Sequence, residues 1–449
     1  MTAPPPPPWA PLGPATAVLR DALYDTIPLP RPVQALLASP PLLRLQGVKQ
    51  LGFVYRVWPS ATHTRFEHSL GVYHLMDRAL AGLWERGDLA ATSPDEPRAL
   101  LAAALLHDVG HYPFSHAIEE LGPPVLPHEQ VGRRLIESEP LATLLERDWA
   151  VPPGRVADLV APRAGPEERR QPLRALLSGA LDVDKLDYLA RDARGCNVPY
   201  GRVDSARLLE SLRLRPLPDG APRLMVSHKG VGAVHSLISA RQEMFDNVYW
   251  HHTNRACVAM LLRAVQDALD ADALPAEELA HHDDGSLLAR LAATGMPPTT
   301  RQLAEALRER ALHKRALELS LRAGAVFHWL DRLFFDPPAR KRTELALGAA
   351  LAAATSVRVG PADVLLDIPK PEKWELDVWV YAARPAVGLA PVLSWLEATG
   401  LDAEHLARYE RHQRRLRVVT VPRLAELAWQ RRDDVILPTL ERLAATSGL

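Results

Sequence analysis

Hydrophobic residues recur at helical spacing through the first half of the chain. Over residues 66–85 they gather on one side of a helical wheel, which predicts an amphipathic helix. Residues 98–107 are apolar on nearly every face, and this pattern is typical of a helix buried in a large core. Gly110 and Pro113 are expected to end that helix. Two further helices are expected at residues 173–192 and 236–267.

The second half of the chain mixes helical and strand-like patterns. A short hairpin is expected at residues 213–228, because Asp219 and Gly220 form a turn dipeptide there. Beyond residue 270, helices are expected at 303–321, at 326–335 and near Pro438, and strands at 356–368, 376–381 and 416–421. The sequence therefore predicts a mainly α fold. It divides into a helical core over residues 17–268 and a smaller mixed α+β region over residues 269–449, packed on that core.

Composition narrows the class of protein. The 449 residues include 54 acidic and 53 basic side chains, so no overall positive field is present to attract nucleic acid or an anionic membrane. Only 2 cysteines are present, which excludes a disulfide-built secreted scaffold and favours a reducing, cytoplasmic compartment. We find no apolar run long enough to span a membrane, so no membrane contact is expected.

Residues 1–16 form a proline-rich segment. The unbroken prolines at residues 4–8 favour a polyproline II conformation, which an aromatic groove on a partner would recognise. The segment lacks the cationic and apolar stretches of a signal peptide. We favour a disordered tail, because a single proline run carries no further recognition motif.

The chain has 17 histidines, and several of them lie between residues 63 and 128. Two acids directly follow histidines there, and the informative pair is His107 and Asp108 at the end of the predicted buried helix. An aspartate at such a place is costly unless it is paired or bound to a metal, and the histidine offers a neutral nitrogen ligand. The pair predicts a site for a divalent ion such as Mg, Mn, Fe, Co, Ni or Zn, with water at the open positions.

The remaining metal ligands must come from other segments, because adjacent side chains on a helix diverge. His68 lies upstream of the pair and Asp184 lies downstream. Spacing alone does not select Asp184 over Asp182 or Asp187, so these alternatives stay open at this point.

Three segments resemble a known family. They are HTRFEHSLGV at residues 63–72, LHDVGHYPFSH at 106–116 and DVDKLDYLARD at 182–192. Together they resemble the HD-domain metal-dependent phosphohydrolases, in the deoxynucleoside triphosphate triphosphohydrolase branch that includes the vertebrate SAM-and-HD-domain enzymes. The resemblance runs from about residue 21 to residue 262. It implies hydrolysis of a dNTP to deoxynucleoside and tripolyphosphate, with four metal ligands: His68, His107, Asp108 and Asp184.

The resemblance also implies roles for other residues. His111 and His116 match histidines at the α-phosphate, and one of the two is expected to protonate the departing nucleoside oxygen. His128 with Glu129 matches a pair that orients this group, and Glu119 stands where relatives carry an acid. The residues that match triphosphate-binding cations are Arg65, Lys185 and Arg241. The residues that match sugar-binding positions are Gln50, Tyr188, Asp192 and Tyr249.

The sequence departs from the family at one regulatory position. Where vertebrate relatives recognise an activating guanine nucleotide, this chain has Leu43 and Gln46, so we do not extend that activation to it. Arg255 follows Asn254 and is expected to be an exposed charge, with phosphate contact as the alternative. Members of the family form oligomers, and a homo-oligomer is therefore expected.

Two alternative functions stay open. The first is another HD-type phosphohydrolase, acting on nucleoside monophosphates, cyclic nucleotides or guanosine tetraphosphate. The second is a nucleic-acid-binding regulatory module with a vestigial site, suggested by arginine-rich stretches at residues 340–342 and 411–417. Balanced charge and few interleaved aromatic residues favour solvated helix faces at these stretches, so nucleic acid is the weaker alternative.

Overall fold

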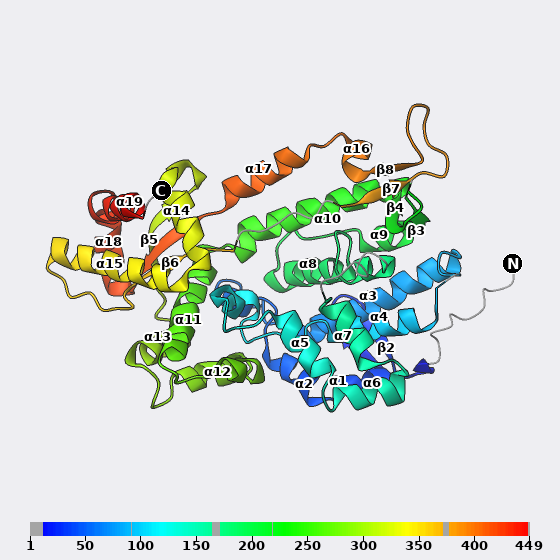
Figure 1. Ribbon diagram of the computed structural model, residues 1–449, viewed down its shortest axis with the longest axis horizontal. Coiled ribbons are helices and arrows are strands. Elements are labelled where there is room, and N and C mark those ends of the chain that lie inside the picture. The colour runs from blue at the N-terminus through cyan, green and yellow to red at the C-terminus, as the bar shows by residue number, and fades with distance from the viewer. Residues whose placement is uncertain (1–11, 91, 164–170, 218, 371–376, 448–449) are drawn as a thin grey trace.

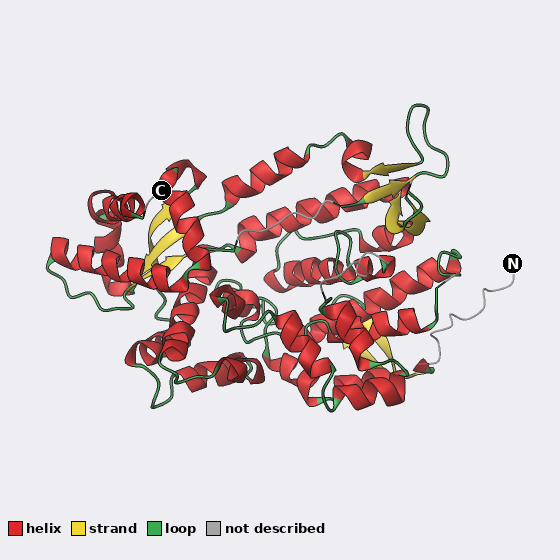
Figure 2. Cartoon of the chain, in the orientation of Figure 1, coloured by secondary structure: helices red, strands yellow, loops and turns green. Residues whose placement is uncertain are grey.

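The computed structural model describes residues 12–90, 92–163, 171–217, 219–370 and 377–447. Helices dominate the described chain, as the sequence predicts, and three small sheets accompany them (Figure 2). The last two helices lie at the left end of the view, and the first two lie along its lower edge, right of the centre (Figure 1). The proline run at residues 4–8 falls outside the described residues.

The N-terminal helices build one continuous hydrophobic core. Helix α3 packs against both α4 and α8, and α4 packs in turn against α7. Nearly every residue of α4 is buried, as its apolar pattern predicts. The helices that contribute to this core are α1 (Arg31–Leu37), α2 (Pro40–Arg44), α3 (Arg65–Glu85), α4 (Asp95–Leu106), α5 (His128–Ile136), α6 (Leu141–Trp149), α7 (Pro153–Val160), α8 (Val183–Cys196), α9 (Ser205–Ser211) and α10 (Val231–Met244). Helix α11 (His252–Asp270) belongs to a second core cluster, which it forms mainly with residues 112–125 and 274–312.

The C-terminal region has a core of its own, built around a three-stranded sheet in the order β5-β9-β6. Strand β9 (Leu416–Thr420) is buried along its whole length and pairs antiparallel with β5 (Lys314–Leu319) and β6 (Val364–Asp367). The helices of this region are α12 (Asp284–Leu291), α13 (Pro298–Glu309), α14 (Ala325–Arg332), α15 (Pro337–Thr355), α16 (Trp395–Thr399), α17 (Ala403–Gln413), α18 (Ala425–Gln430) and α19 (Leu437–Thr446).

The two regions are tied together by chain segments that cross between them. Helix α11 contacts the 3-10 helix η4 (Ser115–Leu121) of the first region and α13 and β6 of the second. The hairpin of β3 (Leu212–Pro216) and β4 (Pro222–Ser227) confirms the hairpin prediction, and β7 (Trp379–Tyr381) and β8 (Val392–Ser394) extend its sheet. Because β7 pairs parallel with β4, part of the C-terminal chain completes a sheet of the first region.

Two predicted helices are each interrupted. The expected helix at 236–267 is split into α10 and α11, because His251 leaves helical geometry and its Nδ1 accepts a hydrogen bond from the Thr253 N–H as an N-cap. The expected helix at 173–192 begins only at Val183, where Asp182 caps α8 by accepting from the Lys185 N–H. Cap chemistry therefore set these boundaries where hydrophobic spacing did not.

The expectation of a helix at 303–321 is wrong in its second half. Helix α13 ends at Glu309 because Arg310 takes a left-handed conformation with φ of 62°. The chain then enters strand β5, which pairs with β9 in the C-terminal core. At the N-terminus, strand β1 (Ala15–Asp21) pairs with β2 (Asp25–Pro30), so an ordered hairpin begins inside the segment expected to be a tail.

None of the helices described by the structure is both long enough and apolar enough to cross a membrane.

The packing of α5 against the loop after α4 predicts opposite effects for two neighbouring glycines. A Cβ on Gly110 would lie 2.1 Å from the His128 carbonyl oxygen and 2.2 Å from the Gly132 nitrogen, whereas the nearest atom to a Cβ on Gly132 is 3.6 Å away. Gly110→Ala should therefore lower the free energy of unfolding by about 1–3 kcal/mol or more through overpacking. Gly132→Ala, the matched control, should raise it by up to about 1 kcal/mol, as usual for alanine in a helix interior. Urea titration followed by circular dichroism measures both, and equal stability of the two variants would contradict this packing.

Candidate metal centre and catalytic site

The orientation of His68 is set by the start of helix α3. Thr64 and Glu67 form a capping box, in which each side chain accepts a hydrogen bond from the other residue's backbone N–H, and this fixes the first turn that carries His68. The Nδ1 of His68 lies 2.8 Å from Asp187 Oδ2. A carboxylate only accepts hydrogen bonds, so Nδ1 carries the hydrogen and the Nε2 lone pair of the neutral ring points to the opposite side.

His107 presents its Nε2 to the same point. Its Nδ1 lies 2.9 Å from the Ala104 carbonyl oxygen, which again leaves the lone pair of the neutral ring on Nε2. The two Nε2 atoms of His68 and His107 are 3.3 Å apart, and Asp184 Oδ1 lies 2.9 Å from the first and 3.8 Å from the second. Burial alone would lower the pKa of His68, but its hydrogen bonds to Asp184 and Asp187 raise that pKa to about 10, so without an ion a proton bridges these atoms. A divalent metal ion can take the place of that proton, and the donor set fits one.

Asp108 borders the same point from the loop after α4. Its carboxylate oxygens lie 3.4 Å from His107 Nε2 and 3.7 Å from His68 Nε2. Burial by itself would raise the pKa of Asp108, but the Arg65 guanidinium, whose Nη1 is 2.6 Å away, and the neighbouring histidines hold that pKa well below its usual range. Asp108 is therefore an ionised oxygen donor beside the three residues that converge most closely.

Behind His68 lies a buried carboxylate that the sequence alone did not assign. Asp187 accepts hydrogen bonds from His68, from the Tyr24 hydroxyl at 2.8 Å and from Arg191 through Nε and Nη2 at 2.8 and 2.9 Å. It therefore orients His68 from behind and does not face the metal position, which separates it from the alternative of a direct ligand. Gly71 makes the contact possible, because a Cβ there would lie 1.9 Å from Asp187 Oδ1.

A second cluster of histidines adjoins the metal position. The rings of His111 and His128 stack with centroids 3.8 Å apart, and the His116 ring meets His111 edge-on at 4.6 Å. His111 is fully buried, and its Nε2 lies 3.3 Å from Asp108 Oδ1, so the second cluster touches the first. Burial and the nearby Arg65 hold the pKa of His111 well below its usual range, which keeps this ring neutral.

Glu119 is the acid that contacts this second cluster most closely. Its Oε1 lies 2.7 Å from His128 Nδ1, whereas the predicted partner Glu129 is half-exposed and lies 3.5 Å away. Burial alone would lower the pKa of His128, but the hydrogen bond to Glu119 outweighs it and raises that pKa. Glu119 Oε2 also lies 3.8 Å from the exposed His116. The acid of this group is therefore Glu119, whose position the sequence showed without assigning a partner.

The predicted sugar-binding residues partly come together. The Tyr249 hydroxyl donates to Asp192 Oδ2 at 2.7 Å, and His63 Nε2 lies 2.8 Å from Asp192 Oδ1. Gln50 is buried, and its backbone carbonyl accepts from Ser115. The Tyr188 ring lies edge-on to His68, with centroids 6.5 Å apart, which places it beside the metal position. Sequence reasoning included His63 in a motif but gave it no contact with Asp192.

The predicted phosphate-binding cations have contacts within the protein. Arg65 binds Asp108 and Ser115 and is buried. Lys185 Nζ lies 2.7 Å from Asp182 Oδ2 and 3.0 Å from the Gly179 carbonyl oxygen. The Arg241 guanidinium lies over the Phe245 ring, 4.9 Å from its centroid.

Several arginines expected on the surface are internal instead. Arg255 is 7% exposed, so the expectation of an exposed charge is wrong. Within the two arginine-rich stretches, Arg340, Arg414 and Arg417 are also buried, and Arg414 pairs with Asp331 while Arg417 pairs with Asp367 and Glu318. These side chains hold the C-terminal region together, which weakens the case for a nucleic-acid surface there.

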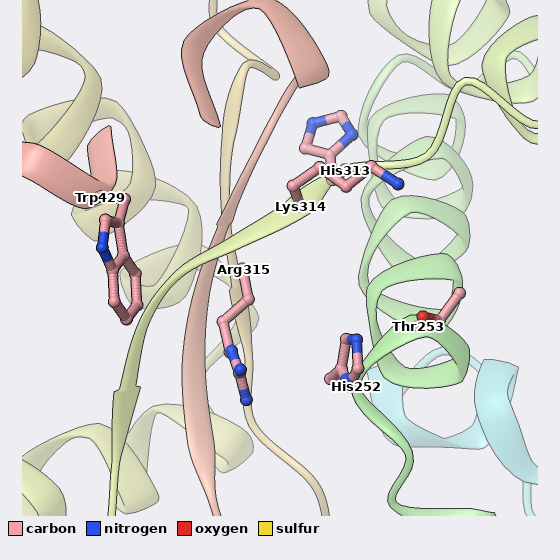
Figure 3. Close-up of a pocket in the computed structure, with 6 residues that line it drawn as sticks. All are labelled: His252, Thr253, His313, Lys314, Arg315 and Trp429. Carbon is pink, nitrogen blue, oxygen red and sulfur yellow. The ribbon is translucent and has the colours of Figure 1, made fainter. Parts of the chain in front are cut away.

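A separate pocket of about 280 Å³ adjoins the first turn of α11. Its lining consists of His252, Thr253, His313, Lys314, Arg315 and Trp429. Figure 3 shows Arg315 on strand β5 between Trp429 and the start of α11, where His252 lies. Burial and nearby arginines lower the pKa of His252, so the positive charge of the pocket comes from Lys314 and Arg315.

Comparisons with known proteins match both regions of the chain. Residues 65–192 match the HD domain family, and residues 203–425 match the family described as HD associated region. An uncharacterized protein of Methanocaldococcus jannaschii is 32% identical over 274 residues, which are 61% of this chain and 54% of that protein. The deoxynucleoside triphosphate triphosphohydrolase SAMHD1 of Homo sapiens is 28% identical over 281 residues, which are 56% of this chain and 45% of that protein. The chain thus spans about half the length of these curated relatives.

Solved structures share the fold along most of the chain. A hypothetical protein from Aquifex aeolicus superposes with a TM-score of 0.67 at 24% identity and covers 92% of this chain and 99% of its own. A phosphohydrolase from Bacteroides thetaiotaomicron superposes with a TM-score of 0.65 at 23% identity and covers 90% of this chain and 100% of its own. At this level of identity the two structures establish the shared fold.

The convergence of donors predicts that His68 is required for metal binding. His68→Ala removes one of the two facing nitrogens, so the purified protein should lose its bound Mn²⁺ or Fe²⁺ after loading and desalting, as measured by inductively coupled plasma mass spectrometry. His328→Ala is the control, because His328 is an exposed histidine on α14 of the C-terminal region. Equal metal content in the two variants would rule out this site.

The buried carboxylate behind His68 predicts a second effect. Asp187→Asn leaves a side chain of the same shape but removes the charge that fixes the His68 tautomer. Metal affinity should fall by about 10- to 100-fold, as is typical when a residue that orients a ligand is changed. Isothermal titration of the metal-free protein with Mn²⁺ measures the affinity, and thermal unfolding checks that the fold remains. An unchanged affinity would show that Asp187 serves packing alone.

Proposed function

Because the chain belongs to the HD-domain phosphohydrolase family, we propose that it is a metal-dependent hydrolase that converts deoxynucleoside triphosphates to deoxynucleoside and tripolyphosphate. The observation that carries the proposal is the contact between two clusters. The metal-ligand group of His68, His107 and Asp184 meets the histidine group through Asp108, whose Oδ1 is 3.3 Å from His111 Nε2. An electrophilic centre and a proton-transferring group are therefore adjacent.

The residues divide the work of phosphate ester hydrolysis between them. A divalent ion bound at this site would polarise a phosphoryl oxygen and lower the pKa of a water molecule. His68, His107, Asp108 and Asp184 would hold that ion, and Asp187 keeps the His68 lone pair directed at it. Arg65 neutralises part of the Asp108 charge, so that a polyphosphate anion meets less repulsion.

His116 is the proton donor that this arrangement favours. A departing nucleoside alkoxide needs a proton, and His116 is exposed where His111 is enclosed. Glu119 lies within ion-pair distance of His116 and hydrogen-bonds His128, so it stabilises positive charge on this histidine group. His111 stays neutral between His128 and Asp108 and separates the donor from the metal ligands.

The sugar-side residues support a nucleotide substrate. Asp192 holds two hydrogen-bond donors, Tyr249 and His63, and its carboxylate is a ready acceptor for a ribose 3′-hydroxyl that exchanges with one of them. Tyr188 lies against His68, so the sugar would be enclosed between Tyr188 and the Asp192–Tyr249 pair. A tyrosine under C2′ leaves no space for a hydroxyl, which is the basis for proposing deoxyribose. A homo-oligomer is part of the same proposal.

A product assay tests the proposed reaction. The purified protein, incubated with each dNTP and with Mg²⁺, Mn²⁺ or Co²⁺, should release tripolyphosphate and deoxynucleoside, resolved by ion-exchange chromatography. Asp108→Asn should reduce the rate by about 100- to 1,000-fold, the size expected when one charge-stabilising group is removed from an active site. His328→Ala, at an exposed position of α14, should retain the rate.

The same assay decides between substrate classes. Nucleoside monophosphates, cyclic nucleotides and guanosine tetraphosphate are run in parallel with the dNTPs, and the ribonucleoside triphosphates test the exclusion of a 2′-hydroxyl. Turnover of one of these alone would replace the dNTP with that substrate. No product from any nucleotide with any of the metals would overturn the proposal.

A further inference from the structure

A buried arginine connects the histidine cluster to the C-terminal sheet. Arg255 lies in the first turn of α11, and its Nη1 and Nη2 donate to the two carboxylate oxygens of Glu120 at 2.9 and 3.1 Å. Its Nε donates to Asp367 Oδ1 at 2.8 Å. Asp367 is fully buried at the end of strand β6. One guanidinium therefore holds an acid from each region of the molecule.

The acid that Arg255 holds in the first region is next to the acid of the histidine cluster. Glu119 and Glu120 are consecutive residues of the 3-10 helix η4. Glu120 takes Arg255 with both oxygens, while Glu119 takes His128 at 2.7 Å. A 3-10 helix has weaker internal hydrogen bonds than an α-helix, so a segment of this kind depends on outside contacts for its position. Fixing Glu120 fixes the backbone from which Glu119 extends.

In the C-terminal region, Asp367 is itself held by a second arginine. Arg417 on β9 donates to Asp367 Oδ2 at 3.0 Å and to Glu318 on β5 at 2.9 Å. The same Arg417 donates to the Trp250 carbonyl oxygen at 3.3 Å. Trp250 directly follows Tyr249, whose hydroxyl reaches Asp192. The sheet thus contacts the chain directly beside the Asp192–Tyr249 pair and reaches the histidine cluster through Arg255.

We propose that Arg255 is a positioning residue, which holds Glu120 against Asp367 so that the C-terminal sheet sets the place of Glu119, His116 and His128 in the reaction. We call Arg255, Glu120 and Asp367 the arginine clamp. Its effect on catalysis rests on the proposed function, whereas its role in positioning η4 follows from the contacts alone. A planar guanidinium suits the position, because it meets two carboxylates in fixed directions where a lysine would meet one.

The same helix provides a matched control for the clamp. Arg263 also lies on α11, is 4% exposed, and pairs with Asp267 at 3.0 Å and Glu344 at 2.5 Å. Asp267 lies in α11 and Glu344 lies in α15, so neither acid belongs to η4. Loss of Arg263 therefore breaks a buried ion pair of the same kind without touching the histidine cluster. The comparison separates a local role in catalysis from a general loss of stability.

The first measurement requires no activity. Hydrogen–deuterium exchange followed by mass spectrometry is applied to the full chain, and the peptide that covers residues 115–121 is compared between variants. Arg255→Ala should exchange faster there than the unaltered protein, because η4 loses its outside contact. Arg263→Ala should leave that peptide unchanged and speed exchange near residues 340–350. Unchanged exchange at 115–121 in Arg255→Ala would overturn the clamp.

The second measurement is the hydrolysis rate. Arg255→Ala should lower kcat by about 10- to 100-fold, because the proton-transferring group is no longer held in its productive position. KM should change by less. Arg255→Lys should recover part of kcat, because it restores the charge but meets one carboxylate, and Arg263→Ala should keep kcat. An equal loss in Arg263→Ala would reduce Arg255 to a stabilising role. If the unaltered protein hydrolyses nothing, the proposed function fails, and the exchange measurement still decides the clamp.

Discussion

The candidate site depends on one buried carboxylate, that of Asp187. It accepts hydrogen bonds from an imidazole, a phenol and a guanidinium at once, and each comes from a different part of the chain. Arg191 supplies the charge that keeps Asp187 ionised without solvent, and burial would otherwise raise its pKa. Without this carboxylate, His68 would have no fixed tautomer, and the two facing imidazole nitrogens would not both present lone pairs. The N-terminal hairpin is therefore tied to the metal position, because it supplies Tyr24 for Asp187 and Asp21 for Arg191.

The core was largely predictable from hydrophobic spacing, and its interruptions were not. The helix at 66–85 and the buried helix near 98–107 follow directly from their patterns, because burial of an apolar face dominates there. The breaks at His251 and Asp182 depend on single side-chain caps, which hydrophobic spacing does not register. The turn of the chain at Arg310 depends on a left-handed residue that is not glycine, so the usual sequence signal for such a turn is missing there.

The candidate site was likewise only partly predictable from the sequence. His107 and Asp108 stood out because an acid at the end of an apolar helix needs a reason, and the structure places them at the converging donors. The choice between Asp184 and Asp187 required the three-dimensional structure, because both lie within the first turns of α8. Only the packing against α3 distinguishes the candidate ligand from the residue that orients His68. A hint was present in the spacing of Asp187 and Arg191, which are one helical turn apart and form an ion pair. Arg255 had no comparable hint, since its two partners come from residues 120 and 367.

Local charge pairing explains why the overall composition gave no sign of these buried charged residues. Most acids of the site have their own partner: Asp108 has Arg65, Asp187 has Arg191, and Glu119 has His128, whose pKa it raises. Such local pairing keeps each buried charge at low cost and leaves the sum over the chain close to zero. It also leaves Asp184, which is the most exposed acid of the metal group, facing two histidine nitrogens. If the proposed polyphosphate substrate binds here, it meets a site in which Arg65 and Lys185 already pair with acids, so its binding would draw on a divalent ion and on rearrangement of cations such as Lys185. That requirement links phosphate affinity to metal occupancy more tightly than a pocket of free arginines and lysines would.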